Sequence, residues 1–247
     1  DQSLDKALEW TAQEGNAFDA VPSPNKDGYY IIGITSNDHK NYNDGKDNVG
    51  AITGIDQTYS KKPHAVIEIE VHYANKQAAN VIYRDVNDPD NPITLETSED
   101  LTGKSDAKID YDPTGKIQYY ESQGYVLKRN DLKDGGVFDN DDSTNQTFYI
   151  DFIHKIVKVT QKDPDTVDPN SLSKDVTEHI TYTGLPATET PAKVTHVLHF
   201  TGSGYLDKVT GKWTDKDGNK LEDQSLDKAL EWTAQEGNAF DAVPSPN

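Results

Sequence analysis

A chain of 247 residues with 43 acidic and 24 basic side chains carries a formal charge of −19. Nucleic acids and anionic membranes are bound through basic surfaces, so this charge argues against both as partners. The absence of cysteine excludes disulfides, thiolate catalysis and thiolate metal sites. The length fits one or two domains. A hydrophobic content of 33% with 13 tyrosines favours thin, strand-rich domains with wet surfaces over disorder.

The most informative feature is a repeat. The 25 residues DQSLDKALEWTAQEGNAFDAVPSPN occupy positions 1–25 and recur unchanged at 223–247. A second copy 222 residues after the first predicts a tandem array, in which repeated units multiply weak contacts. A cloning duplication is the alternative. In the array interpretation the chain holds one repeat plus a short overlap, and its ends need not be domain ends.

The repeated segment predicts a short helix that Ser3 caps and that stops near Gly15, with Trp10 covering a neighbouring sheet. The apolar face of this helix is Leu4, Ala7, Leu8 and Thr11. Next, 28–34 (GYYIIGI) predicts a buried strand. A polar loop rich in Asn, Asp and Gly follows at 37–48.

The stretch 64–74 (HAVIEIEVHYA) alternates with period two, which predicts a half-buried strand. The inward side chains are Ala65, Ile67, Ile69, Val71 and Tyr73, and the outward ones are Glu68, Glu70 and His72. Paired carboxylates serve glycoside hydrolysis. Glu68 and Glu70 lie two apart on an exposed strand without a predicted cleft, so a solvated face is the favoured interpretation.

A second unit begins near Ala79 and runs in the order hairpin, helix, strand, long closing strand. The helix starts at Asp112-Pro113, with Asp as its cap, and stops at Gly124. Ile117 and Tyr120 form its apolar face. The predicted strands are 80–85, 93–100, 125–128 and 147–160, with an acidic turn at 85–92. This is the element order of a β-grasp, or ubiquitin-like, domain.

The polar stretch 163–173 contains prolines and no apolar period, which predicts a linker. A strand pair follows at 175–184 and 193–201, then a turn at 205–211 and a short strand at 212–214. In a tandem array the residues that follow Asn25 would also follow Asn247. The hairpin, the repeated segment and the strands after it would then have the same element order as the middle unit.

We therefore predict an α+β fold of tandem ubiquitin-like β-grasp domains in an elongated rod. The predicted divisions are 1–75, the second part of one domain; 79–162, a complete domain; 163–173, the linker; and 174–247, the first part of the next domain.

Several segments of the chain, taken in their order, carry a resemblance to a known family. In the middle unit they are Val81-Ile82-Tyr83, Leu101-Thr102-Gly103-Lys104, Gly124-Tyr125 and Phe138–Phe148 with Thr147-Phe148-Tyr149, which resemble the MucBP-type domain of mucus-binding (MUB) repeats. VTHVLHFTGSGYLDKVTGKWT and EWTAQEGNAFDAVPSPNKDGYYIIG resemble the larger partner domain. The resemblance covers essentially the whole chain.

The resemblance implies a cell-wall-anchored, extracellular adhesin of gut lactic-acid bacteria. Its implied partners are mucin glycoproteins and their glycans, neighbouring repeats, and immunoglobulins for some repeats. It implies no catalytic activity and no required cofactor. It supplies no motif of binding residues, so none is transferred.

Two acidic segments offer hard oxygen ligands of the kind that calcium binds. The predicted calcium ligands are Asp85, Asn87, Asp88 and Asp90 in the first turn, with Asp139 and Asp141 in the loop before the last strand. Neighbouring Asn91, Asn140 and Asp142 add further oxygens, and a weaker candidate is Asn37, Asp38, Asp44, Asp47 and Asn48. Ordinary turn chemistry, in which such side chains bond local backbone groups, is the favoured alternative.

The seven histidines show no zinc-site spacing. They are His39, His64, His72, His154, His179, His196 and His199. His196 and His199 lie three apart on a predicted strand and so on opposite faces. No nucleophile-elbow, Walker or dinucleotide motif is present in the sequence.

Aromatic side chains are the better lead to a function, because tyrosine offers a flat contact surface with a polar handle. The candidates near polar loops are Tyr29, Tyr30, Tyr42 and Tyr59 in one unit and Tyr111, Tyr119, Tyr120 and Tyr125 in the other. We expect Tyr120 and Tyr125, as well as Trp10 and Trp232, to be core residues.

Three functions fit these observations: a non-catalytic adhesin repeat that binds mucin weakly per copy, a stalk segment without a ligand, and a glycosidase. The adhesin repeat is favoured and the glycosidase is the least supported. Because the first and last segments are complementary pieces of one domain type, we also expect the C-terminal segment to be ordered by a partner, such as the start of a neighbouring chain.

Overall fold

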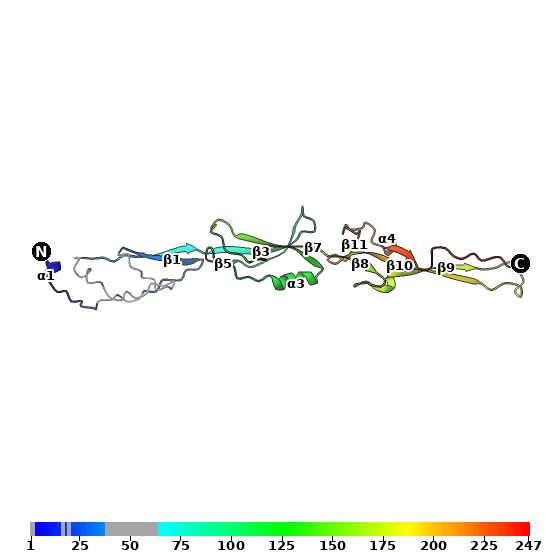
Figure 1. The fold of residues 1–247 in the computed structure, drawn as a ribbon, viewed down its shortest axis with the longest axis horizontal. Coiled ribbons are helices and arrows are strands. Elements are labelled where there is room, and N and C mark those ends of the chain that lie inside the picture. The colour runs from blue at the N-terminus through cyan, green and yellow to red at the C-terminus, as the bar shows by residue number, and fades with distance from the viewer. Residues whose placement is uncertain (1–2, 16–17, 19–20, 38–63) are drawn as a thin grey trace. The chain divides into compact units, whose positions relative to one another are not determined.

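The computed structural model describes residues 3–15, 18, 21–37 and 64–247, whose helices and strands are labelled in Figure 1. The chain divides into two compact units. Unit 1 is Asp1–Ile82, Thr97–Tyr111 and Asp131–Phe148; unit 2 is Tyr83–Glu96, Asp112–Asn130 and Tyr149–Asn247. The structure is mostly β-sheet with few helices, and the described strands form three sheets. No helix in the described ranges is long and apolar enough to cross a membrane.

The first sheet has two antiparallel strands, β1 (Tyr29–Ser36) and β2 (Ile69–Asn75). The strands were predicted, but the expectation that 28–34 is buried was wrong. Tyr29 is 49% and Ile32 60% exposed, because a two-stranded ribbon leaves much of each strand open to water. Glu68 and Glu70 are exposed, as the alternation predicts.

The second sheet has the strand order β4-β3-β7-β6, with β5 paired to β3. Its strands are β3 (Gln77–Asp85), β4 (Ile93–Thr97), β5 (Leu101–Gly103), β6 (Tyr125–Asn130) and β7 (Gln146–His154). Strands β3 and β7 pass through both units. On β3, burial alternates along the whole strand, which places every second side chain in a core.

Helix α3 (Thr114–Ser122) lies between β5 and β6 in the chain and begins one residue after the predicted Pro113. Asp112 Oδ1 accepts a hydrogen bond from Thr114 N at 2.9 Å, which is the predicted capping role. The helix ends before Gly124, whose φ of +96° is the left-handed conformation that favours glycine.

An aromatic core in unit 2 joins α3 to β3 and β7. Tyr83 and Phe152 are fully buried, and Tyr120 is 9% exposed. The Tyr120 ring centroid lies 5.2 Å from that of Phe152 and 5.7 Å from that of Tyr83. The predicted apolar face of the helix is therefore confirmed.

The third sheet, in unit 2, is built around β10 (Val194–Asp207), to which every other strand of the sheet is paired. Its other strands are β8 (Ile156–Thr160), β9 (Ser173–Ile180), β11 (Trp213–Thr214) and β12 (Glu231–Ala234). The predicted hairpin of β9 and β10 is present, with Thr201 opposite Ser173 and Val194 opposite Ile180. β8 pairs with the C-terminal part of β10.

The predicted single strand at 147–160 was wrong, because it is two strands in two sheets. β7 ends at His154 and pairs with β6, whereas β8 begins at Ile156 and pairs with β10. The change of partner occurs at Lys155. Its N–H donates to Gly124 O at 2.8 Å, and its carbonyl accepts from Lys208 N at 2.9 Å.

The stretch 163–173 is not a free linker in its second half. Leu172, at the end of the 3₁₀ turn η1 (Pro169–Leu172), is fully buried. It packs in a core with Val159, Leu206 and Trp213. Asp168 caps the turn by accepting from Asn170 N at 2.9 Å. Two apolar residues five apart give no period, so the sequence pattern missed this anchor.

The two copies of the repeated segment have different structures. Each begins with one helical turn, α1 (Leu4–Ala7) or α4 (Leu226–Ala229). In the C-terminal copy the chain then extends into β12, and Leu230 is 6% exposed. In the N-terminal copy the equivalent Leu8 is 48% exposed. The expected longer helix is wrong, because Leu230 reaches the core only where the chain leaves the helix and joins β10.

We predict that Gly124→Ala destabilises unit 2 by more than its backbone conformation alone requires. A Cβ on Gly124 would lie 2.5 Å from the backbone of Lys208, which cannot move aside as a side chain could. Gly211 also has positive φ, +68°, but has open space around it, so Gly211→Ala is the matched control.

The control should lose roughly 1 kcal/mol of unfolding free energy. The Gly124 variant should lose about 1–3 kcal/mol more because of the overlap with Lys208. Urea unfolding of both variants measures this, and equal losses would show that the contact with Lys208 is unimportant.

Candidate functional site

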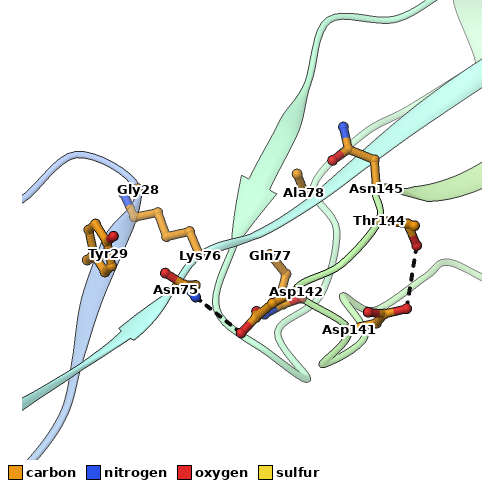
Figure 2. Close-up of a pocket in the computed structure, with 10 residues that line it drawn as sticks. All are labelled: Gly28, Tyr29, Asn75, Lys76, Gln77, Ala78, Asp141, Asp142, Thr144 and Asn145. Atoms are coloured by element: carbon orange, nitrogen blue, oxygen red, sulfur yellow. Dashed lines mark hydrogen bonds between the residues drawn. The ribbon is translucent and has the colours of Figure 1, made fainter.

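A hollow of about 350 Å³ in unit 1, which we call the amide pocket, gathers polar side chains from β1, β2, β3 and the loop before β7 (Figure 2). It is lined by Gly28, Tyr29, Asn75, Lys76, Gln77, Ala78, Asp141, Asp142, Thr144 and Asn145. Asn75 ends β2, Lys76 follows it, and Gln77 begins β3. This change of strand brings three consecutive polar side chains to one place.

Asp142 organises the amide pocket. Its Oδ1 accepts from Gln77 Nε2 at 2.6 Å. Its Oδ2 accepts from Asn75 Nδ2 at 3.1 Å (Figure 2). Gln77 is 6% exposed, so this carboxylate holds a largely buried amide in place. Asn145 Nδ2 donates to Asn80 Oδ1 at 2.9 Å, which fixes the far side of the loop. The polar groups are thus preorganised by mutual hydrogen bonds.

A second hollow of about 270 Å³, the tyrosine pocket, shares Tyr29 and Lys76 with the amide pocket. It is lined by Pro24, Asn25, Lys26, Asp27, Tyr29, Tyr30, Ile31, Tyr73, Lys76 and Lys104. Tyr73 donates to Pro24 O at 2.6 Å. Lys104 Nζ lies 5.5 Å from the ring centroid of Tyr30, within the range of a cation–π contact.

These pockets present flat aromatic surfaces beside amide, carboxylate and ammonium groups. Such a set can stack on a sugar ring and bond its hydroxyls in both directions, because amides donate and accept. Tyr29, half exposed and shared by both pockets, is the aromatic side chain best placed to meet a ligand.

The structure places only some of the predicted aromatic candidates in the pockets. Tyr29 and Tyr30 line them, whereas Tyr120 is in the core. Tyr119 is 55% exposed on α3. The predicted Tyr42 and Tyr59 lie outside the described residues. Tyr111 packs against the small core of Ala79, Ile109 and Phe138 in unit 1.

Sequence reasoning missed Lys76, Gln77 and Lys104. Lys104 was visible as the last residue of the LTGK segment, and its position there was the available signal. Gln77 carried no signal, because a single glutamine beside a strand has no pattern. Tyr73 was expected to face inward and is half-buried, and its role in lining a pocket was not predicted.

In the acidic turn after β3, the aspartate side chains accept hydrogen bonds from backbone N–H groups of the same turn. Asp85 Oδ1 accepts from Asn87 N at 2.9 Å. Asp88 accepts from Asp90 N at 3.1 Å and from Asn91 Nδ2 at 2.8 Å. The Asn91 side-chain bond, followed by the Asp90 backbone bond, lowers the pKa of Asp88. These contacts are the turn chemistry that the sequence analysis favoured over calcium.

The loop before β7 behaves in the same way. Asp139 accepts from Asp141 N at 3.3 Å, and Asp141 accepts from Ser143 N at 2.8 Å. The Ser143 hydroxyl bond, followed by its backbone bond, lowers the pKa of Asp141. Within the described ranges no group of three or more His, Asp or Glu side chains is placed to hold a metal ion. The calcium site stays a prediction.

The weaker acidic candidate is described only at Asn37. Its Nδ2 donates to Val66 O at 2.9 Å and its Oδ1 accepts from Glu68 N at 3.1 Å, so it ties the end of β1 to the chain before β2. Its other members, Asp38, Asp44, Asp47 and Asn48, lie outside the described residues, as does His39.

One histidine has a special environment. His154 Nδ1 lies 2.6 Å from Asp207 Oδ2, and its Nε2 lies 2.8 Å from Asp85 Oδ2. A carboxylate faces each ring nitrogen, so the cationic form of the ring, in which both nitrogens carry hydrogen, can donate to both carboxylates. We call these three side chains the histidine clamp. His154 N also donates to Asn87 Oδ1 at 3.0 Å.

The pKa values of His154, Asp207 and the neighbouring Tyr125 are shifted. Burial alone would lower the pKa of His154, but its hydrogen bonds to Asp207 and Asp85 outweigh this and raise it. Burial would raise the pKa of Asp207, yet the bond to His154 and the N–H groups of Thr210 and Val209 lower it. Burial, followed by the charge of Asp85, raises the pKa of Tyr125 to about 12.

The other described histidines make separate contacts. His72 lies 2.8 Å from Thr35 Oγ1. His196 lies 3.1 Å from Glu178 Oε1, and His199 lies 2.9 Å from Glu236 Oε1. His196 and His199 therefore have different carboxylate partners.

Comparison with known families gives two matches that together take in more than half of the chain. Residues 77–154 match the model of the Mucin binding domain, and residues 167–247 match that of the Muc B2-like domain. No curated protein matches the chain.

The solved structures that are similar to this chain include the following two. The crystal structure of Mub-RV has 27% sequence identity and a TM-score of 0.46, over 69% of this chain and 82% of that one. The type 2 repeat of the mucus binding protein MUB from Lactobacillus reuteri has 30% identity and a TM-score of 0.38, over 56% of this chain and 76% of that one.

The histidine clamp predicts how stability depends on pH. The raised pKa of His154 means that the folded chain holds this proton more tightly than the unfolded chain. The stabilisation is complete below the ordinary histidine pKa of about 6.5 and is lost as the pH rises through the raised value. For Asp207, whose pKa is lowered, the stabilisation is complete above its ordinary pKa of about 3.9 and is lost as the pH falls through the lowered value.

We therefore expect the unfolding free energy to fall as the pH rises above about 6.5, and His154→Gln to remove that fall. His179→Gln is the control, since His179 contacts only the neutral Thr195 hydroxyl in its hydrogen bond at 3.1 Å. Urea unfolding across this pH range measures both variants. The prediction fails if His154→Gln keeps the wild-type pH dependence.

Proposed function

This chain belongs to the mucus-binding repeat family, and we propose that it is a non-catalytic repeat of a bacterial surface adhesin that binds mucin glycoproteins through their glycans. The observation that carries the proposal is the match of residues 77–154 to the Mucin binding domain. The matched families are mucus-binding domains and not enzymes, which supports the non-catalytic role. An extracellular location, with the anchor elsewhere in the parent protein, follows from the same proposal.

We propose the amide pocket and the tyrosine pocket as the glycan site. A volume of about 350 Å³ is in the range of small-molecule sites in proteins. The amides of Asn75 and Gln77 donate to Asp142. Each amide also has a carbonyl oxygen that can accept from a sugar hydroxyl. The exposed face of Tyr29 offers the stacking surface.

Weak binding by each repeat is sufficient for such a function. The pockets are open and polar, so a single repeat gains little from burying apolar surface. Neighbouring repeats raise the effective concentration of sites near a mucin chain, and the avidity of an array then exceeds the affinity of one unit. The 222-residue period of the sequence supports such an array.

The β-grasp assignment is part of the same proposal. The strand order β4-β3-β7-β6 puts the first strand of the segment 77–154 beside its last strand, at the centre of the sheet. Helix α3 packs on this sheet through Tyr120. The tandem rod and the binding of immunoglobulin stay predictions.

We expect this chain to bind immobilised intestinal mucin saturably and to lose that binding when terminal sugars are removed. Tyr29→Ala and Lys76→Ala should each weaken binding, by about tenfold for a loss of about 1.4 kcal/mol. Tyr119→Ala is the control, because Tyr119 is 55% exposed and lines neither pocket. Surface plasmon resonance measures the affinities, and an immunoglobulin-coated surface tests that partner separately.

If no saturable binding to mucin is measured in any condition, the proposal is contradicted, and a stalk segment without a ligand remains as the function. Saturable binding that neither pocket variant weakens would keep the function and reject the site. Release of sugar from mucin incubated with the chain would contradict the non-catalytic role.

Calcium at the acidic turns has its own test. If Asp85, Asn87, Asp88 and Asp90 hold an ion, or if Asp139 and Asp141 hold one, calcium should raise the melting temperature and a chelator should lower it. Asp88→Asn should reduce the rise, because carboxylate charge sets calcium affinity. Identical melting curves with calcium and with chelator would eliminate the site.

A further inference from the structure

The two central strands of the second sheet, β3 and β7, are neighbours that run parallel to each other. In unit 1, Gln77 Nε2 donates to Asp142 Oδ1 at 2.6 Å, in the loop that leads into β7. Further along both segments, Asn145 Nδ2 donates to Asn80 Oδ1 at 2.9 Å. The residue numbers of the partners rise together, which is the order of a parallel pair and not of an antiparallel one.

The contacts at the other end of the two strands, in unit 2, follow the same direction. Val86 N donates to Phe152 O at 2.8 Å, and His154 N donates to Asn87 Oδ1 at 3.0 Å. The end of β3 therefore lies beside the end of β7. It follows that the first residue of β3 and the last residue of β7 lie at opposite ends of the pair.

A buried ion pair joins the same two strands. Arg84 on β3 donates to both carboxylate oxygens of Asp151 on β7, at 2.8 and 2.9 Å. Asp151 is 5% exposed, and the Arg84 guanidinium carbon lies 3.7 Å from the ring centroid of Tyr149. Tyr83 and Phe152, on the opposite face of the strands, are fully buried. Hydrogen bonds that are shielded from water in this way are stronger than exposed ones.

The chain enters and leaves this segment at the two ends of the parallel pair. β2 ends at Asn75, two residues before Gln77, and β8 begins at Ile156, two residues after His154. A pull on the chain from both sides therefore draws the start of β3 and the end of β7 in opposite directions along the strands. The contacts between the strands then share the force and have to break together. In a hairpin that is pulled at its open ends, they break one after another.

We propose that the segment 77–154 has a mechanical function: it resists unfolding when the chain is under tension, because tension loads the parallel β3–β7 pair in shear. This function needs no ligand, so it goes beyond the binding of mucin and does not depend on it. The resistance is directional. It is high when the two ends of the pair are pulled apart along the strands, and low when both strands are pulled apart from the same end.

Engineered cysteines can test this directionality within one domain, because the chain has no cysteine of its own. Lys76→Cys with Lys155→Cys gives attachment points at opposite ends of the pair. Asp90→Cys with Lys155→Cys gives attachment points at the same end, since Asp90 lies in the turn after β3. All three positions are exposed. Single-molecule force spectroscopy of the full chain measures the unfolding force in each geometry.

We expect the Lys76 and Lys155 attachments to require a several-fold higher unfolding force than the Asp90 and Lys155 attachments at the same pulling speed. The 79 residues from Gln77 to Lys155 span up to roughly 3.6 Å each when extended. The folded strands already span roughly 30 Å, so complete unfolding should lengthen the molecule by about 250 Å. This length identifies the event as the unfolding of the segment.

Two asparagine variants test whether the contacts between the strands resist the force. Asn87→Ala removes the acceptor for His154 N, whereas Asn91→Ala removes only a hydrogen bond to Asp88 within the turn. Both are measured at constant force with the Lys76 and Lys155 attachments, where the unfolding rate is the relevant quantity. Asn87→Ala should unfold up to about tenfold faster, as expected for the loss of one hydrogen bond. Asn91→Ala should unfold at the rate of the parent.

Urea unfolding of the two cysteine variants checks that both are folded and equally stable. Equal unfolding forces in the two geometries would overturn the proposal. It is also overturned if Asn87→Ala unfolds under force no faster than Asn91→Ala.

Discussion

The contact of the His154 ring with Asp85 on one side and Asp207 on the other is the interaction on which the arrangement of unit 2 depends. His154 is the last residue of the Mucin binding domain match, and Asp207 lies in the Muc B2-like match. One imidazole therefore bonds both segments. The backbone at Lys155 continues the connection, since it bonds Gly124 on one side and Lys208 on the other. A lone buried charge would be costly, and two carboxylates offset that cost here.

This junction sets where β8 starts, and β8 sets the position of β10. Because β8, β9, β11 and β12 all pair with β10, the sheet has one strand on which its order rests. The core beneath it collects residues from distant parts of the chain, including Leu172 from η1 and Leu230 from the repeated segment. The glycines at 202 and 204 are as much a part of that packing as the leucine they admit.

Local features were predictable from the sequence, and long-range ones were not. The Asp112 cap, the stop at Gly124 and the β9–β10 hairpin follow from neighbouring residues. The break at Lys155 does not, because the residues on both sides of the polar pair His154-Lys155 are strand-forming and only a change of partner strand divides them. Tyr29 was a candidate from its position near polar loops. Its neighbours Lys76 and Gln77 had no pattern, and His154 was one of seven histidines until the fold brought two aspartates to its ring.

Because residues 1–25 and 223–247 have the same sequence, each copy can serve as the reference for the other in a measurement of local stability. Any difference in amide exchange between residues 3–15 and 225–237 arises from context, since intrinsic exchange chemistry is the same for both. Proteolytic peptides from within the two copies have the same mass. Their deuterium uptake would therefore appear as two superposed isotope envelopes, a slow one from the strand that lies on β10 and a fast one from the exposed copy. A single averaged uptake value would hide both states.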